Sequence, residues 1–386
     1  MTTITSVDNA LKSVYLDTVS EQLNTKINPL LANINRTSSD VWGKDIKKLI
    51  HYGLNGGVCA GTETGTLPVS GENYYEQFTL PLINLYGTIE ISDKAIRASR
   101  NSAGAFVNLL NAEMESLIKA SQFNLSRMFY GDGKGILATT IDDSSGRSIT
   151  VDNTNNLTEG MIVDIYIGDN EKIVECGRIL SIDREKNIVY FSGIIGEIKK
   201  GAFLTIQNSY NNELVGLGSI FKDSGSLYGL SREKHKWLIP YMIKNVGEIN
   251  ENIIQKAIDE IYETSGSEIN FIVCSAGVKR ALLKHLATNN STLDTIDISN
   301  GYKGLSYNGI PIVTDRFCPK GTMYLLNTND FAMHQLCDWT WLESGNGTIL
   351  QQVPNKPVYK ATLVKYANLI CNKPCGQGML SGIIEK

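Results

Sequence analysis

The sequence Gly61-Thr-Glu-Thr-Gly-Thr-Leu-Pro-Val-Ser-Gly-Glu-Asn-Tyr-Tyr75 leads into a second stretch, Leu85-Tyr-Gly-Thr-Ile-Glu-Ile-Ser92. The first stretch is rich in glycine, serine and threonine, which is typical of an extended, exposed segment. The second has the composition and alternation of a β-strand. We therefore expect an extended hairpin over residues 61–95, in which the chain returns into a strand.

A long helix is predicted directly after this hairpin, from about Ser102 to Tyr130. Its apolar positions are spaced three, four or eight residues apart: Phe106, Leu110, Met114, Leu117, Leu125 and Met128. Asn101 or Ser102 can cap its start, and the glycines of 131–135 end it. At about 1.5 Å per residue the helix would be roughly 40 Å long. A helix of this length would extend beyond one small hydrophobic core. From the hairpin and the helix together we therefore predict that the molecule contacts neighbouring molecules.

Length and composition fit an ordinary soluble chain. With 386 residues and domains of about 100–200 residues, we expect two or three domains. The hydrophobic content is 42%, the charged content 20%, the net charge −4 and the pI about 5.7, which argues against a dedicated nucleic-acid binder. The sequence contains neither a long apolar run nor a secretory signal, so we expect no membrane span and a cytoplasmic protein.

The cysteines do not predict a metal site. The chain has 7 cysteines and 4 histidines, and the cysteines are widely scattered with mostly apolar neighbours. Such a pattern fits reduced, buried thiols. Cys371 and Cys375 form the one close pair, and the nearest histidine in the sequence is His334. We therefore expect neither a metal nor a cofactor.

The hairpin is wholly acidic, because no lysine or arginine occurs between Lys48 and Lys94. It carries Glu63, Glu72 and Glu76. One interpretation is a solvated surface hairpin. The other is an arm that binds a basic partner surface, where complementary charge would set the register of the contact.

The first 60 residues predict an arm made of two amphipathic helices, at residues 7–24 and 41–54, joined by a polar linker. Such pieces cannot form a core alone, so we expect them to lie on the body of this chain or on a neighbour.

Residues 148–208 have a different character and predict five short strands, at 148–151, 160–167, 173–182, 188–191 and 203–206. Closely spaced strands over about 60 residues indicate a small β-barrel or sandwich, inserted as its own module. This module has few aromatic residues and no basic stripe, which favours a decorative or stabilising role.

The remaining chain predicts a glycine-broken segment and an α/β unit. Residues 209–245 contain a basic cluster, Arg232, Lys234, His235 and Lys236. Residues 246–345 alternate helical and strand patterns, beginning with an amphipathic helix at 249–264 and a buried strand at 269–274. A long closing strand at 357–371 needs partners from earlier in the chain, so we expect a discontinuous second domain.

The search for catalytic residues yields one weak arrangement. Cys274-Ser275-Ala276-Gly277 lies where a strand turns into a helix, which is the place of an activated nucleophile, with His285 or His334 as a conceivable base. The simpler interpretation is that Ser275 caps the helix and Cys274 ends a buried strand.

The order of these parts resembles a known family. The evidence is the order of elements together with Gly65-Thr-Leu-Pro68, Tyr86-Gly-Thr-Ile-Glu-Ile-Ser-Asp-Lys94, Met128-Phe-Tyr-Gly-Asp-Gly-Lys-Gly135 and Tyr307-Asn-Gly-Ile-Pro-Ile-Val-Thr-Asp315. In this order the chain resembles a tailed-bacteriophage major capsid protein of the Hong Kong 97 fold, an α+β fold. The resemblance covers nearly the whole chain except the predicted barrel.

The resemblance implies a division of the chain. It consists of an N-terminal arm (1–60), an E-loop (61–95), a P domain with its spine helix (96–147, helix 102–130), an inserted β-barrel (148–208), a P-domain continuation (209–245), an A domain (246–345) and a closing P-domain strand (346–386).

The resemblance also implies a structural protein without enzymatic activity, in the capsid of a virion assembled in the host bacterial cytoplasm. Hexamers and pentamers of the chain would form an icosahedral shell around double-stranded DNA contacted non-specifically, with a portal protein and a separate scaffolding protein as partners. Between residues 61 and 93 the E-loop has no lysine for the isopeptide crosslink that some members form. We expect non-covalent contacts through residues Glu63, Glu72, Glu76, Arg97, Arg100, Arg232, Lys234 and Lys236.

Three alternatives remain open at this stage. An encapsulin-like nanocompartment shares the fold but encloses protein cargo, and it is usually shorter and without a barrel. A hydrolase that uses Cys274 and a carbohydrate-binding surface protein that uses the barrel are the others.

Overall fold

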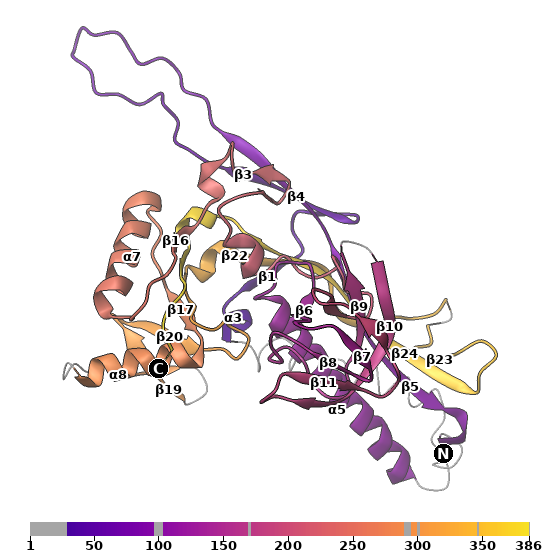
Figure 1. Ribbon diagram of the computed structural model, residues 1–386. Helices are drawn as coiled ribbons and strands as arrows, with labels where there is room; N and C mark the ends of the chain where they lie inside the picture. The colour runs from indigo at the N-terminus through magenta and orange to yellow at the C-terminus, as the bar shows by residue number, and fades with distance from the viewer. Residues whose placement is uncertain are drawn as a thin grey trace.

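A computed structural model describes residues 29–95, 103–168, 171–288, 295–298, 302–345 and 347–385. The helix predicted at 7–24 lies outside these residues, as do Arg97 and Arg100. Figure 1 shows three β-rich parts and a long loop that leaves the body. Short elements connect them: α3 (Pro29–Ala32), α6 (Leu217–Ile220), β14 (Ser226–Leu227), β15 (Leu230–Ser231), η2 (Lys236–Leu238), η3 (Thr328–Asp330) and η4 (Pro374–Gly376).

A five-stranded sheet lies at the centre of the chain. Its longest strand, β24 (Val358–Cys371), pairs antiparallel with β5 (Ile83–Ser92) on one side and with β22 (Phe331–Trp341) on the other. The strands β1 (Asn35–Thr37) and β23 (Gln351–Gln352) complete it. The closing strand predicted at 357–371 therefore takes its partners from earlier in the chain, as expected.

The long helix α5 (Ala103–Met128) packs on this sheet and spans 26 residues, about 39 Å at 1.5 Å per residue. Met114, Leu117 and Leu125 are buried in the interface, as the periodicity predicted. A Cβ atom on Gly87 of β5 would lie 2.7 Å from Leu117 Cδ1. Gly87 is therefore the residue that lets helix and sheet approach closely.

The chain between residues 41 and 54 is not helical, so the second helix predicted for the N-terminal arm is wrong. It forms β2 (Val41–Trp42) and β3 (Asp45–His51), which pairs antiparallel with β4 (Tyr75–Pro81). Ile46 and Ile50 are buried. Their spacing fits a helix as well as a strand, and the pairing partner that decides between the two lies far along the chain.

A six-stranded antiparallel sheet forms a separate unit with its own core. Its order is β6 (Ile136–Thr139), β13 (Phe203–Ile206), β9 (Ile162–Ile167), β10 (Glu171–Asp183), β11 (Ile188–Phe191) and β8 (Ser148–Thr150). A bridge between Thr140 and Val151 joins the two edges of the sheet, which is the closure expected of a small barrel. The short pair β7 (Ser144–Gly146) and β12 (Gly196–Ile198) lies beside it.

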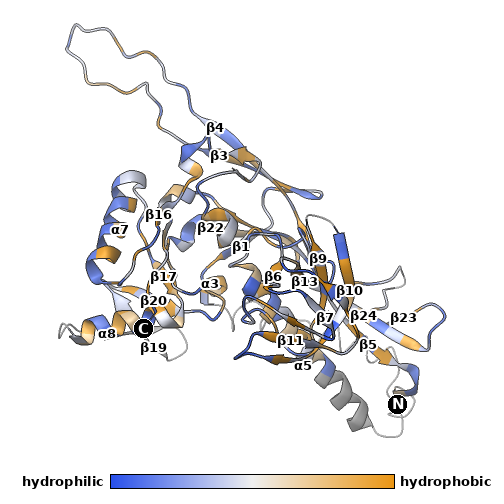
Figure 2. Ribbon diagram, viewed as in Figure 1, coloured by the Kyte–Doolittle hydropathy of each residue, from blue (hydrophilic) through white to orange (hydrophobic). Residues whose placement is uncertain are grey.

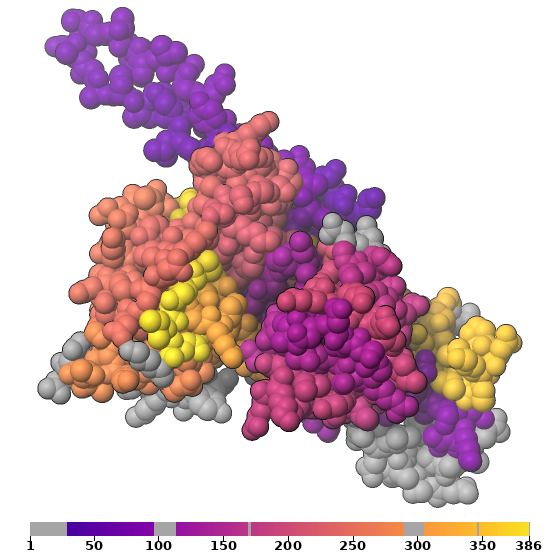
Figure 3. Space-filling view, viewed as in Figure 1, coloured from indigo at the N-terminus to yellow at the C-terminus, as the bar shows by residue number. Residues whose placement is uncertain are grey.

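A seven-stranded sheet forms the third part. Its order is β16 (Tyr241–Ile243), β25 (Gly378–Leu380), β21 (Met323–Leu326), β17 (Phe271–Cys274), β20 (Ile310–Thr314), β19 (Tyr302–Tyr307) and β18 (Thr295–Ile298). Its core includes residues of α7 (Glu251–Ser265) and α8 (Ala276–Thr288). Asn250 caps α7 by accepting from the Ile253 amide at 2.9 Å, and Gly266 ends it at φ 64°. The space-filling view in Figure 3 shows this unit and the six-stranded unit as two masses with a furrow between them.

Candidate subunit-contact surfaces

The loop between β3 and β4, residues 52–74, leaves the body of the molecule as an extended arm (Figures 1 and 3). Hydrogen bonds join its two limbs near the base, including Tyr52 N to Tyr74 O at 3.0 Å. At about 3.3 Å per residue its eleven or so residues per limb can reach roughly 35 Å. We call residues 52–74 the arm loop.

Large apolar side chains on the arm loop are almost fully exposed. Leu54 and Leu67 are each 90% exposed, and Val58 and Val69 are each 87% exposed. Figure 2 shows hydrophobic positions distributed along this loop. Four large apolar side chains exposed on one loop make it a candidate for contact with another molecule.

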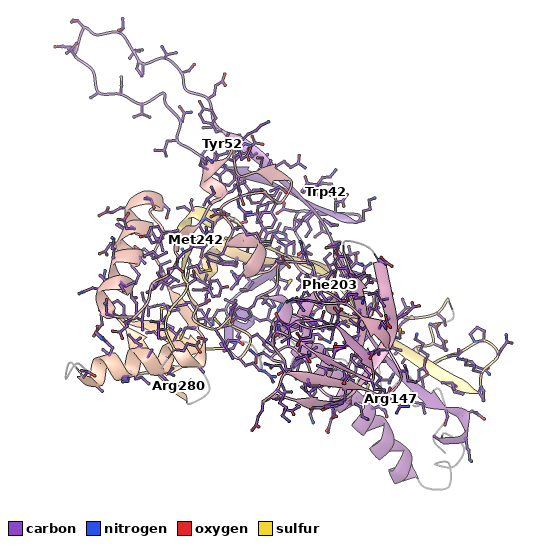
Figure 4. All side chains as sticks on the ribbon, viewed as in Figure 1. Trp42, Tyr52, Arg147, Phe203, Met242 and Arg280 are labelled. Atoms are coloured by element: carbon purple, nitrogen blue, oxygen red, sulfur yellow. The ribbon has the colours of Figure 1, made fainter. Side chains whose placement is uncertain are left out.

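An aromatic stack holds the base of the arm loop. The Trp237 ring lies between Tyr52, at 5.0 Å and 14°, and Phe78, at 5.8 Å and 15°. Phe78 is fully buried, so the stack anchors both limbs to the body. Figure 4 shows Tyr52 at the point where the limb leaves the strand.

One of the three predicted acidic contact residues lies close to a side chain of its own chain. Glu63 and Glu72 are exposed on the arm loop. Glu76 lies at its base, where Glu76 Oε1 is 3.8 Å from His235 Nε2. Part of the predicted basic cluster therefore lies against an acidic residue of the same chain.

Arg232 does not belong among exposed contact residues. It is 1% exposed, and its guanidinium donates to the carbonyl oxygens of Ser219, Ile220 and Ser224 at 2.8, 2.9 and 3.1 Å. It therefore stabilises its own chain. Lys234 and Lys236 are exposed beside the arm base, whereas Arg97 and Arg100 lie outside the described residues.

Sequence reasoning missed an exposed face on the three-stranded sheet. Trp42, Leu49 and Tyr75 lie on it and are 69%, 65% and 51% exposed, and Figure 4 shows Trp42 beside the turn that joins β2 to β3. The alternation of residues 45–51 was the signal, but the helical interpretation of this stretch hid it.

The proposed nucleophile lacks the properties of one. Cys274 is fully buried, and burial raises its pKa to about 12, so the reactive thiolate is strongly disfavoured near neutral pH. Ser275 Oγ donates to Glu385 Oε1 at 2.5 Å and accepts from the Val278 amide. These contacts fit the capping interpretation.

The two conceivable bases have other partners. His285 Nε2 is 3.0 Å from Glu251 Oε2, and His334 Nδ1 is 2.9 Å from Ser39 O. Within the described ranges, no group of three or more histidine, cysteine, aspartate or glutamate side chains is placed to hold a metal. The described helices include none that is long and apolar enough to cross a membrane.

The cysteines are all free thiols, but not all are buried as expected. Cys274, Cys318 and Cys371 are buried, whereas Cys59 on the arm loop and Cys176 on β10 are exposed.

Comparison with known proteins supports the fold through structure alone. No protein-family model matches the sequence, and no curated protein matches it. The chain is similar to the structure of the Cyanophage A-1(L) capsid asymmetric unit, with a TM-score of 0.57 and 12% identity over 93% of this chain and 94% of that chain. It is more distantly similar to the Synechococcus elongatus PCC 7942 SrpI encapsulin (TM-score 0.46, 9% identity, 95% of each chain) and to the capsid of Myoviridae phage XM1 (TM-score 0.43, 10% identity, 92% of each chain). The chain has the Hong Kong 97 fold that the resemblance predicted.

Proposed function

We propose that this chain, which has the fold of phage capsid proteins, is the major capsid protein of a tailed bacteriophage and self-assembles into an icosahedral shell around genomic DNA. The observation that carries the proposal is the arm loop. Its exposed leucine and valine side chains extend away from a body that already has three well-formed cores. Such a loop gains its packing from another copy.

We propose a correspondence between the parts of the fold and the parts of such a subunit. We assign β3, β4 and the arm loop to the E-loop and α5 to the spine helix. The five-stranded sheet belongs with α5 to the P domain, the seven-stranded sheet to the A domain and the six-stranded sheet to the inserted barrel. Because β22 pairs with β24, we place β22 in the P domain and end the A domain before it.

The proposed role is structural, and its mechanism is repetition of modest contacts. Each subunit would contact neighbours through the E-loop and the N-terminal arm, in hexamers and pentamers related by symmetry. Many weak contacts made at once hold a shell far more tightly than one does. Since the arm loop contains no lysine, the contacts that it makes would be non-covalent.

The proposed partners follow from the same role. A separate scaffolding protein and a portal protein would take part in assembly in the host cytoplasm. Double-stranded DNA would meet the inner face of the virion shell without base readout, in keeping with the net charge of −4.

Electron microscopy of the purified chain tests the proposal. We expect uniform closed shells, and shells produced in infected cells should contain DNA. A chain that stays monomeric under all assembly conditions would contradict it, whereas shells filled with protein cargo would favour an encapsulin-like compartment.

The charge on the E-loop gives a sharper test. Reversing Glu63 and Glu72, which are exposed, should impair shell formation and leave the subunit soluble. Reversing Glu72 and Glu76 together should do the same, although Glu76 also lies near His235 in its own chain. Unchanged assembly in both variants would remove the electrostatic part of the proposal.

A further inference from the structure

A groove of about 840 Å³ opens where α5, the six-stranded unit and the segment after β20 meet. Its floor includes Phe123 of α5, Met161 before β9 and Phe317 after β20. The Phe123 and Phe317 rings meet edge to face, 5.0 Å apart at 85°. The groove therefore has an aromatic, apolar floor built from three separate parts of the fold.

The rim of the groove is basic. It carries Lys119, Arg178, Arg184 and Arg316. Glu159 offsets part of this charge, since Arg184 Nη2 lies 4.0 Å from Glu159 Oε2. The other acidic lining residue, Asp315, is buried and accepts from Tyr130 Oη at 3.0 Å. Cations therefore outnumber exposed carboxylates at the rim.

Two rim residues are available for an incoming chain. The Arg316 guanidinium lies 5.0 Å from the Phe123 ring centroid and 4.9 Å from that of Phe317, and its side chain is exposed. Arg178 is exposed on β10.

The arm loop has the complementary pattern. Leu67, Pro68 and Val69 form an exposed apolar centre, and Glu63 and Glu72 flank it. The arm loop cannot reach the groove of its own chain, because it points away from α5 and the six-stranded unit (Figure 1). The complementary segment must therefore come from a second copy of the chain.

We infer that the groove binds the arm loop of a second copy, with Leu67–Val69 on the aromatic floor and Glu63 and Glu72 near Arg178 and Arg316. The inference rests on the proposed shell-forming function and deepens it by naming the receptor. It also gives the six-stranded unit a role, because Met161, Arg178 and Arg184 supply one wall of the groove.

Charge exchange in the full-length chain tests this pairing. Arg178→Glu with Arg316→Glu should lower the yield of shells at least about tenfold, because like charges would then face each other across the contact. Glu63→Arg with Glu72→Arg should do the same, and a chain with all four changes should recover most of the yield. Lys200→Glu, an exposed change on the same unit that lies outside the groove, is the matched control and should assemble normally.

A crosslinking experiment covers the case in which a charge variant fails to fold. Benzoylphenylalanine in place of Leu67 should, in assembled shells of mixed isotope labelling, crosslink to the Phe123 or Met161 peptide of a different copy. Crosslinks only to other regions would overturn the inference, as would normal assembly of both charge-reversed variants or a four-fold variant no better than either parent. A wild-type chain that forms no shells refutes the proposed function instead.

Discussion

Replacing Asp338 with alanine would leave a buried ammonium group without its carboxylate. Lys365 lies on β24 with a side chain that is 1% exposed, and its Nζ donates to Asp338 Oδ1 at 2.5 Å and to Gln335 Oε1 at 2.8 Å. Its ammonium also lies 5.8 Å from the centroid of the Trp339 ring. Burial lowers the pKa of Lys365, and Asp338 opposes that effect. The carboxylate is therefore the main compensation for desolvation of the charge.

Removing one partner of a buried ion pair typically costs about 3–5 kcal/mol. We expect a loss near the lower end, about 3 kcal/mol in the free energy of unfolding, because the side chain of Asp338 is 35% exposed and Gln335 still accepts from the ammonium. Lys365→Met removes the charge itself and should be close to neutral, both alone and combined with Asp338→Ala.

Urea unfolding of dispersed subunits measures these differences, with tryptophan fluorescence from Trp339 and Trp341 on β22 as the local signal. The reasoning is refuted if Asp338→Ala unfolds at the wild-type urea concentration, or if adding Lys365→Met does not rescue it. The effect should also depend on pH. Burial raises the pKa of Asp338 but Lys365 outweighs this and lowers it. The stabilisation is therefore present at neutral pH and lost as the pH falls through a folded-state pKa below the ordinary value of about 3.9.

Three further predictions concern other parts of the chain. Gly87→Val should destabilise the subunit by about 1–3 kcal/mol, because its Cβ would lie 2.7 Å from Leu117 Cδ1; a wild-type melting temperature would contradict this. Brief treatment of the native chain with a thiol reagent at pH 8 should modify Cys59 and Cys176, which are exposed, before the buried thiols. Mass spectrometry can follow the order of modification, and early modification of Cys274 would contradict the burial of its thiol. Glu385→Gln should flatten the loss of thermal stability between pH 5 and 3, because hydrogen bonds from Ser275 and Gly321 lower the pKa of Glu385 despite the opposing effect of burial; parallel pH profiles for the two proteins would count against that role.

Local patterns in the sequence were enough to predict the elements whose stability is local. The apolar positions of α5 and the amphipathic pattern of α7 are set within a few turns of helix. The strands of the six-stranded unit also came out close to their predicted bounds, because β11 and β13 are short apolar runs bounded by turn residues.

The errors arose where distant pairing decides the structure. Residues 41–54 carry apolar positions that suit either a helix or a strand, and β4 selects the strand. Arg232 was predicted as a candidate subunit contact because it lies in a basic cluster, but the carbonyl groups of Ser219 and Ile220, 13 and 12 residues earlier, bind its guanidinium inside the fold. The groove could not be predicted at all, because its lining comes from segments far apart in the sequence that only tertiary packing brings together.

The place of β25 in the seven-stranded sheet affects the order in which the subunit can be completed during synthesis. β16 joins that sheet through β25, which in turn pairs with β21. Residues 241–243 therefore leave the ribosome well before residues 378–380, the strand that attaches them. Pairings between such distant segments form slowly. A nascent subunit therefore cannot finish this sheet early, and a truncated chain that lacks β25 would expose an unpaired sheet edge that quality-control proteases can recognise.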